Sequence, residues 1–281
     1  MELGIGMFGD ISNNKSAKQR LIETIEEAKI SDQVGLNVFA LGEHHRSDYA
    51  VSSPEMVLSA IASVTKDIKL ASAVTVLSSS DPVKVYEDFA TLDLLSDNRA
   101  EIMVGRGSFI ESFPLFGYDL KDYEKLFEEK LDLLINLNHN EIVNWKGSVR
   151  APLHQQPIFP RSEQKSGLPI WIAVGGTPAS VVRAATLGLP LIVAIIGGMP
   201  IQFKPLFELY KKTYLEAGHP IEQMQIGMHG HTFISDDANT TDNYYNYYAN
   251  QMNRIGRDRG WPPYNKDQYD FGRGITGLVA G

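Results

Sequence analysis

The sequence predicts an α/β fold in which parallel strands close into a single (β/α)8 barrel. Apolar runs rich in β-branched residues alternate with amphipathic segments along the whole chain. This alternation indicates a parallel sheet that is covered by helices. Eight such runs within 281 residues match the strand number and the length of one barrel, although this length could also hold two domains.

Each predicted strand is a short apolar run, because parallel strands buried on both faces carry continuous rather than alternating apolar side chains. The predicted strands are Leu3–Phe8, Leu36–Leu41, Ile68–Leu77, Ala100–Gly105, Ile170–Val174, Leu191–Ile196, Met224–Phe233 and Gly277–Ala280. No helical segment follows the last run. We therefore expect the full domain to extend beyond Gly281, so that the chain is a truncated form.

Segments with helical periodicity separate the strands. They are Ala17–Val34, Pro54–Thr65, Pro82–Leu95, Tyr123–Leu137, Pro178–Leu187, Ile201–Ala217 and Asp242–Arg259. Ser16 with Gln19 three residues later is a capping-box pattern. Ser53, Asp81 and Thr177 each stand before a proline that suits the first helical position. Each cap follows a strand, which places these loops on the catalytic face of a barrel.

One long segment, 138–167, breaks the regular alternation. It contains Trp145 and three prolines and is too long for a simple connection. We interpret it as an insertion after the fourth β/α unit and as a candidate lid over the barrel mouth. The chain is otherwise predicted to form one domain, 1–281.

Composition excludes several classes of protein. The chain has no cysteine, which rules out disulfides, zinc–thiolate sites, iron–sulfur clusters and cysteine nucleophiles. Its net charge is -8 and no Lys/Arg cluster stands out, so we expect no nucleic-acid partner. The N-terminus lacks the features of a signal peptide, and no apolar run approaches the ~20 residues of a membrane helix. We expect a cytoplasmic protein with no membrane contact.

Glu43, His44 and His45 follow the second predicted strand. Barrel enzymes place catalytic groups at the carboxyl ends of their strands, and histidine can hold or transfer protons near neutral pH. The alternative is a buried or capping histidine with a salt-bridging Glu43. Both interpretations stay open at this stage.

Two strand ends carry features of an anion site. Arg106 lies between two glycines, one of them Gly107, where a guanidinium would suit a phosphate; the alternative is a salt bridge to a nearby glutamate. Gly175, Gly176, Thr177 and Ser180 follow the fifth strand, where free amides at a helix start can bind an anion. The two features could converge on one phosphate. A third glycine-rich strand end, 196–200, is interpreted as a tight turn.

His229 and His231 lie on one face of the seventh predicted strand. With His44 and His45 they could bind a metal, and the alternative is a polar lining of the pocket. The tyrosines that follow point in too many directions of a helix to form one site, so they are interpreted as structural.

At this point the residues resemble the bacterial luciferase-like monooxygenase family. The resemblance rests on the order and spacing of Glu43–His45, Val76–Val83, Glu87–Asp93 and Gly105–Gly107. It covers most of the chain. The resemblance implies a (β/α)8 barrel that binds reduced FMN or, in some branches, the deazaflavin F420. It also implies an insertion after the fourth β/α unit.

The resemblance further assigns residues. It implies that Arg106 contacts the flavin phosphate, as does the helix start with Gly176, Thr177 and Ser180, although luciferase has an acidic residue where Gly176 stands. A non-prolyl cis peptide under the flavin ring maps onto Ala73–Val74, where composition alone singles out no peptide bond. The family's active-site histidine maps onto His44.

The resemblance also implies a homodimer that packs the second and third helices, Pro54–Thr65 and Pro82–Leu95. The leading hypothesis is a two-component monooxygenase without a metal, in which a separate reductase supplies reduced FMN and O2 oxygenates a small organic substrate. His44 would act on protons, with Glu43 or His45 in support. The rivals are an F420-dependent hydride-transfer enzyme, a metal-dependent barrel hydrolase and a non-catalytic flavin carrier.

Overall fold

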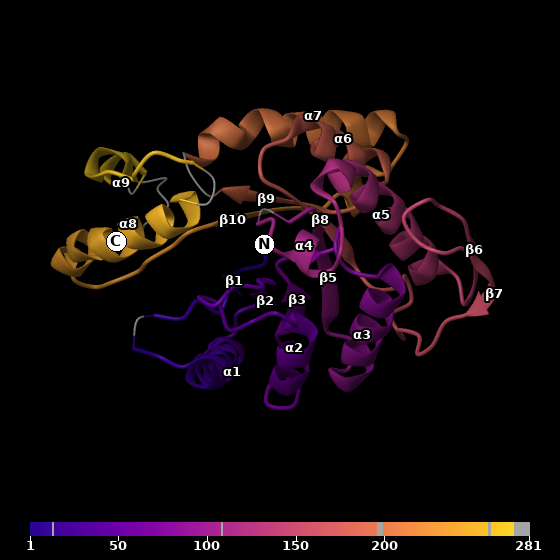
Figure 1. Ribbon diagram of the computed structural model, residues 1–281, viewed down its shortest axis with the longest axis horizontal. Coiled ribbons are helices and arrows are strands. Elements are labelled where there is room, and N and C mark those ends of the chain that lie inside the picture. Colours follow the sequence, from indigo (N-terminus) through magenta and orange to yellow (C-terminus); the bar gives the residue numbers. More distant parts are fainter. Residues whose placement is uncertain (13, 108, 196–198, 258–259, 273–281) are drawn as a thin grey trace. The chain divides into compact units, whose positions relative to one another are not determined.

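The computed structural model describes residues 1–272 except 13, 108, 196–198 and 258–259 (Figure 1). The chain divides into two compact units, Met1–Ala173 and Val174–Gly281. The predicted strand Gly277–Ala280 and most of the predicted turn at 196–200 lie outside the described residues.

The first unit is built on a parallel sheet with the strand order β1-β2-β3-β5-β8. These strands are β1 (Gly4–Met7), β2 (Val38–Leu41), β3 (Lys69–Ser72), β5 (Ala100–Gly105) and β8 (Ile170–Val174), and the short β4 (Thr75–Val76) also pairs with β5. Met7 lies opposite Leu41, and Leu41 lies opposite Ser72. Because these strand ends are level, the residues that follow them emerge at one edge of the sheet.

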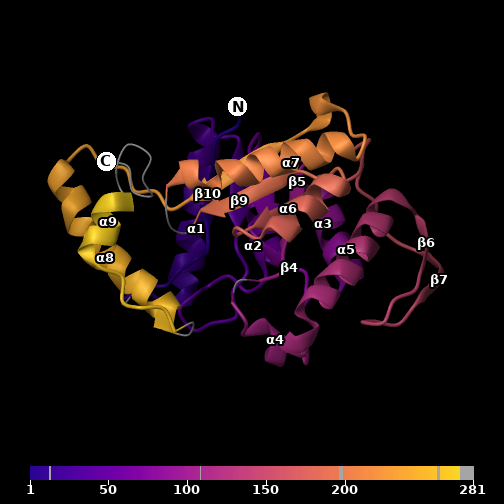
Figure 2. The same ribbon diagram turned by 90° about the horizontal axis from the view of Figure 1, so that it is seen from above.

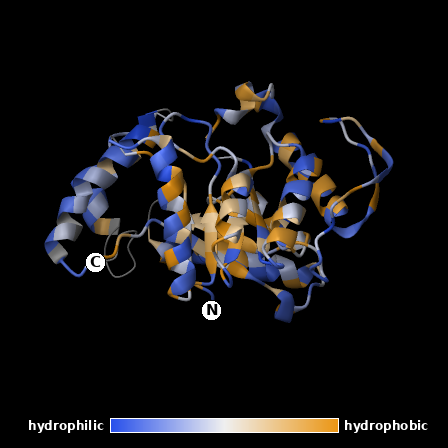
Figure 3. Cartoon of the chain, turned by 90° about the horizontal axis from the view of Figure 1, so that it is seen from below, coloured by the Kyte–Doolittle hydropathy of each residue, from blue (hydrophilic) through white to orange (hydrophobic). Residues whose placement is uncertain are grey.

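Helices connect the strands of this unit: α1 (Ala17–Gln33), α2 (Pro54–Ala62), α3 (Pro82–Leu95) and α5 (Tyr123–His139). Figure 1 shows α1, α2 and α3 side by side along the sheet, and neighbouring helices in the chain are in contact. Apolar residues gather where the helices meet the sheet (Figure 3). The buried apolar side chains of this unit include Phe39, Leu70, Phe89 and Ile102. The burial of these apolar surfaces holds the layers together.

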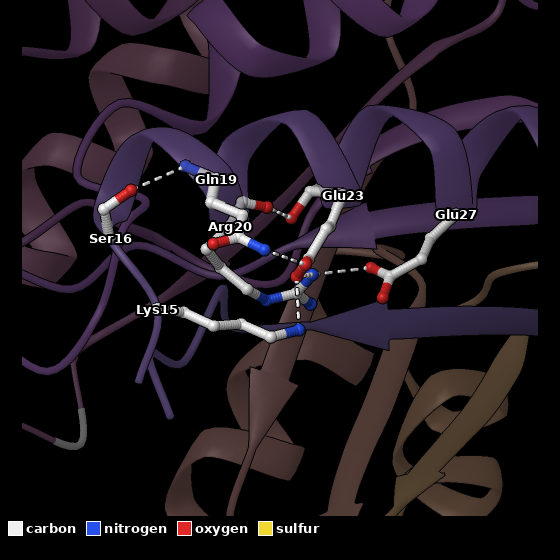
Figure 4. A network of polar contacts seen from close by, with 7 residues as sticks. Lys15, Ser16, Gln19, Arg20, Glu23 and Glu27 are labelled. Atoms are coloured by element: carbon white, nitrogen blue, oxygen red, sulfur yellow. Dashed lines mark hydrogen bonds and ion pairs between the residues drawn. The ribbon is translucent and has the colours of Figure 1, made fainter. Parts of the chain in front are cut away.

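The start of α1 shows how a local sequence signal becomes structure (Figure 4). The Ser16 hydroxyl accepts a hydrogen bond from the backbone N–H of Gln19 at 3.1 Å, as the capping pattern predicts. The Gln19 side chain donates to Glu23 at 3.2 Å. Arg20 pairs with Glu27 at 2.9 Å and braces the first turns of the helix.

The insertion contains an antiparallel hairpin of β6 (Ile142–Trp145) and β7 (Leu153–Pro157), which composition did not reveal. The indole of Trp145 donates to Asp132 of α5 at 2.9 Å. Arg150 pairs with Asp81, the N-cap residue of α3, at 3.0 Å. These contacts fasten the hairpin to two helices of the unit, and its role as a lid stays a prediction.

A shorter excursion between β5 and α5 holds the helix α4 (Ser112–Leu115) and the 3-10 turn Leu120–Asp122. No strand or helix is predicted from the sequence between Gly105 and Tyr123. Because it follows the carboxyl end of a central strand, it lies where barrel enzymes carry functional loops.

The second unit contains β9 (Leu191–Ile195) and β10 (Ile226–Gly230), which pair in parallel. α6 (Pro178–Thr186) and α7 (Lys204–Glu216) pack against each other (Figure 2). The 3-10 turns Pro200–Phe203 and Ile221–Gln223 and the helices α8 (Ala238–Arg257) and α9 (Lys266–Gly272) complete the described elements.

Tyr248, Met252 and Tyr269 form a buried cluster between α8 and α9, with Tyr244 and Tyr245 packed against it. This packing agrees with the structural interpretation for Tyr244, Tyr245 and Tyr248, whereas Tyr247 is 41% exposed. Among the helices of the described residues, none has the length and apolar character needed to cross a membrane.

Candidate active site

Glu43 connects the end of β2 to the segment around β4. One carboxylate oxygen accepts from the backbone N–H of Val76 at 2.8 Å, and the other is 2.8 Å from Nε2 of His45. The side chain is buried, so both bonds are shielded from water. Glu43 therefore holds two neighbouring strand ends in a fixed arrangement.

His45 is the titratable partner in this arrangement. The hydrogen bond to Glu43 raises the pKa of His45 above its usual value, against the opposing effect of burial. The sequence left open whether Glu43 forms a salt bridge. In the structure its partner is His45.

His44 is enclosed by aromatic rings. Its ring centroid lies 4.3 Å from that of Tyr49, 4.5 Å from that of Phe109 and 5.3 Å from that of Phe8. Burial, and secondly the positive charge of Arg46, lowers the pKa of His44 to about 4. At neutral pH the imidazole is therefore uncharged and can both accept and donate a proton.

The residues that enclose His44 come from separate loops. Phe8 follows β1, and Tyr49 lies in the loop after β2, where it forms an isolated bridge with Asp10. Phe109 and Phe116 lie in the excursion after β5, and the Phe116 ring is 5.0 Å from that of His45. We name residues 109–116 the cover segment, because this segment places aromatic rings against both histidines.

Sequence reasoning missed these aromatic residues. Phe8 ends a predicted strand, which was an available signal, whereas Tyr49 and Phe109 lie in loops with no local pattern. Together the rings leave His44 only 8% exposed.

The peptide bond Ala73–Val74 is cis, as the family resemblance implies. It separates β3 from β4, so the predicted strand Ile68–Leu77 is two short strands. Both residues are half-buried and carry small side chains. They offer a smooth surface next to the strand end that Glu43 holds.

The glycines beside Arg106 are required by packing. A Cβ on Gly105 would lie 2.7 Å from a methyl of Val74, and one on Gly107 would lie 2.7 Å from a methyl of Val76. Gly107 also has φ +83°, a conformation that favours glycine. These glycines let β5 and the segment Val74–Val76 approach closely.

Arg106 forms an ion pair with Glu124 of α5, which is the alternative that the sequence left open. Its guanidinium lies 5.3 Å from the ring centroid of Tyr123, and the Tyr123 hydroxyl donates to the carbonyl of Gly107 at 2.8 Å. The Arg106 side chain is one-fifth exposed, whereas Glu124 is more than half exposed. An incoming anion could therefore replace Glu124 at little cost.

In the second unit, Gly175, Gly176 and Thr177 connect β8 to α6 and are exposed. Apart from their neighbours in the chain, the described residues place no atom within 4 Å of a Cβ built on Gly175 or Gly176. The Ser180 hydroxyl is buried without a hydrogen-bond partner among the described residues. Open backbone at a helix start, together with an unsatisfied hydroxyl, is suited to an anion.

His229 lies on β10, whereas His231 follows the end of the strand at Gly230, so the predicted strand Met224–Phe233 is shorter in the structure and does not carry both histidines. Burial lowers the pKa of both, that of His231 to about 4. Nδ1 of His231 is 2.9 Å from the Tyr248 hydroxyl. In the described part of the chain, no three His, Asp or Glu side chains are grouped so that they could hold a metal ion. The hypothesis of a metal-dependent hydrolase gains no support from these contacts.

Residues 1–274 match the family model described as luciferase-like monooxygenase. An uncharacterized protein, y4wF, of Sinorhizobium fredii is 31% identical over 189 residues, which are 66% of this chain and 55% of that protein. The oxygenase component of a flavin-dependent trigonelline monooxygenase from Acinetobacter baylyi is 24% identical over 263 residues, 85% of this chain and 68% of that protein. The chain thus spans little more than half of the first of these relatives.

Solved structures share the fold. The monooxygenase RslO1 from Streptomyces bottropensis has a TM-score of 0.84 at 23% identity, over 92% of this chain and 79% of that one. The oxygenating constituent of 3,6-diketocamphane monooxygenase from Pseudomonas putida, in complex with FMN, has a TM-score of 0.73 at 18% identity, over 94% and 80%. An F420-dependent secondary alcohol dehydrogenase has a TM-score of 0.71 at 18% identity, over 90% and 76%. These likenesses confirm the predicted TIM-barrel fold class.

Proposed function

The chain belongs to the luciferase-like monooxygenase family, and we propose that it is a flavin-dependent monooxygenase that uses reduced FMN and O2 to oxygenate a small organic substrate. The observation that carries this proposal is the buried, uncharged His44 among Phe8, Tyr49 and Phe109 at the carboxyl ends of the strands. A neutral imidazole in a dry site can exchange a proton with a reacting group without presenting a permanent charge.

The proposed roles follow from the contacts of each side chain. Bound flavin would supply the activation of O2. His44 would hold or move a proton at the reacting oxygen, and the rings of the cover segment would exclude water. Glu43 and His45 support this role, because their hydrogen bond fixes the backbone on either side of His44.

The residues proposed to hold FMN fit its parts. Arg106 would exchange Glu124 for the phosphate, since a dianion attracts the guanidinium more strongly than a half-exposed carboxylate. In the second unit, the Gly175–Gly176 turn, Thr177 and the unsatisfied hydroxyl of Ser180 offer donors that would suit a phosphate. The ring would lie over Ala73–Val74, beside Gly107.

Two partners belong to the proposal. The relative from A. baylyi is named as an oxygenase component, and we propose that this chain likewise works with a separate flavin reductase in the cytoplasm. We also propose a homodimer through α2 and α3, where Met56 is 70% and Leu95 is 63% exposed. Exposed apolar side chains of this size favour a protein–protein contact.

Hydride transfer with F420 is the second candidate, because one of the similar folds belongs to an F420-dependent dehydrogenase. A flavin carrier without catalysis is the third. The test is a titration of the purified chain with FMN and with F420, each oxidised and reduced, followed by O2 uptake in the presence of a flavin reductase. Preferential binding of reduced FMN with substrate-dependent O2 uptake supports the proposal. Preference for F420 favours hydride transfer, and the absence of binding by either cofactor refutes both.

A further inference from the structure

Nδ1 of His44 is buried and makes no hydrogen bond within the described part of the chain. The nearest carboxylate oxygen recorded for it is Oε1 of Glu111, at 3.9 Å. That separation is longer than a hydrogen bond, which requires about 2.7–3.2 Å. A buried ring nitrogen without a partner is uncommon in folded proteins and calls for an explanation.

We propose that Glu111 is a positioning residue whose carboxylate accepts a hydrogen bond from Nδ1–H of His44 and so decides which ring nitrogen is free to take a proton. The proposal deepens the proposed function, on which the catalytic role of His44 rests. The contact between the two side chains can nevertheless be tested without any flavin.

The other charged groups near His44 are already engaged. Asp48 is bound by Arg46 through two hydrogen bonds of 3.0 and 3.3 Å. Glu43 is bound by His45 and by a backbone N–H. Glu111 is the carboxylate next to His44 for which the described residues show no such bond, and its side chain is 23% exposed.

Glu111 lies in the cover segment, where a small movement would bring its carboxylate closer to His44. It stands directly before α4, inside the cover segment that places Phe109 against His44 and Phe116 against His45. A shift of about 1 Å by this carboxylate would bring the 3.9 Å separation into hydrogen-bond range. A shift of this size lies within the ordinary thermal motion of a partly exposed side chain and needs no bound ligand.

The contact would have a chemical consequence. When Nδ1 carries the proton and donates it to Glu111, Nε2 of the neutral ring is an acceptor. The same carboxylate would stabilise the charged ring once Nε2 has taken a proton. Glu111 would thus orient the imidazole and favour its protonated form, while the positive charges of Arg46 and His45 oppose that form.

The test uses the full chain labelled with ¹⁵N-histidine, with the His44 signals assigned by their loss in His44→Asn. NMR reports the ring tautomer and its titration for the wild type, Glu111→Ala and Glu111→Gln. Glu163→Gln is the control, because it removes one exposed carboxylate elsewhere in the same unit.

We expect the wild-type ring to carry its proton mainly on Nδ1. Glu111→Ala should shift the population toward Nε2–H at least threefold. Glu111→Gln should restore the Nδ1–H form, because its amide oxygen still accepts, but should lower the pKa of His44 by about 1 unit, because the charge is gone. The control should change neither property.

The proposal is overturned if the wild type favours Nε2–H, or if His44 has the same tautomer and titration in the folded Glu111 variants. If Glu111→Ala does not fold, the titration of His44 in Glu111→Gln is sufficient to test the proposal. If the wild type binds neither FMN nor F420, the proposed function fails, and the NMR comparison still decides on Glu111.

Discussion

Replacing Glu43 by glutamine would remove the charge of this side chain while keeping its shape. The amide oxygen can still accept from the backbone N–H of Val76, which lies 2.8 Å from the carboxylate. The amide nitrogen would then face Nε2 of His45, so the charge-assisted hydrogen bond is replaced by a neutral one. The variant therefore isolates the electrostatic part of the contact between Glu43 and His45.

The size of the effect depends on pH. The folded-state pKa of His45 is raised above the value of about 6.5 expected in the unfolded chain. The stability that this contact contributes is therefore complete below pH 6.5 and is lost as the pH rises through the folded-state pKa. A charge-assisted hydrogen bond contributes about 1.5–3 kcal/mol and a neutral one about 0.5–1.5 kcal/mol. Glu43→Gln should thus lower the free energy of unfolding by about 1–2 kcal/mol at pH 6 and by less than about 1 kcal/mol at pH 9.

Urea unfolding followed by circular dichroism between pH 6 and 9 measures this difference. Burial lowers the pKa of His44 and of His231 to about 4, below the pH range of this assay, so these two side chains do not produce a difference between the proteins between pH 6 and 9. Glu163→Gln, at an exposed position, should change the free energy of unfolding by less than about 0.5 kcal/mol at every pH. A difference for Glu43→Gln that is independent of pH, or larger at pH 9, would refute the reasoning.

Three further predictions concern the same unit. Arg106→Ala should weaken FMN binding about 10- to 100-fold but riboflavin binding less than about threefold, because riboflavin lacks the phosphate. Fluorescence titration measures both affinities. Equal losses of affinity for FMN and riboflavin would contradict the assignment of Arg106 to the phosphate. Lys130 is 2% exposed, and burial lowers its pKa to about 8, so wild-type stability should rise by about 2 kcal/mol between pH 8 and 9.5. Lys130→Met should lack this rise in urea unfolding, and a rise of the same size in the variant would rule out Lys130 as its source. Gly107→Ala should lower the free energy of unfolding by about 1–3 kcal/mol in the same assay, because Gly107 has φ +83° and a Cβ would meet Val76 at 2.7 Å. An unchanged midpoint of urea unfolding would contradict this prediction and show that the backbone adapts.

Much of the fold follows from local patterns in the sequence. Ala100–Gly105 and Pro82–Leu95 begin and end in the structure where the sequence predicts them. The prediction succeeds there because an apolar run, a capping side chain and a proline act within a few residues. The predicted strand Ile68–Leu77 is instead divided at Ala73–Val74, and the hairpin in the insertion was not foreseen. Polar and proline-rich residues give no clear period in the hairpin, so its pairing depends on contacts with α5.

The candidate site divides in a similar way. Its strand-end residues could be selected from the sequence because the carboxyl ends of parallel strands meet at one edge. The hydrogen-bond partners and protonation states of those residues could not be predicted from the sequence. The partner of Arg106 is Glu124, 18 residues away, and the bond from Glu43 reaches Val76, 33 residues away.

By itself the sequence determined the alternation of strands and helices, the absence of cysteine chemistry and the positions of Glu43, His44, His45 and Arg106 at strand ends. Only the tertiary structure decided that His44 is uncharged and enclosed by rings, while His45 is paired and favours its charged form. Propensity and periodicity act between neighbours in the chain. Burial and charge act between neighbours in space, and for His44 those neighbours are Phe8, Tyr49 and Phe109 from three different loops.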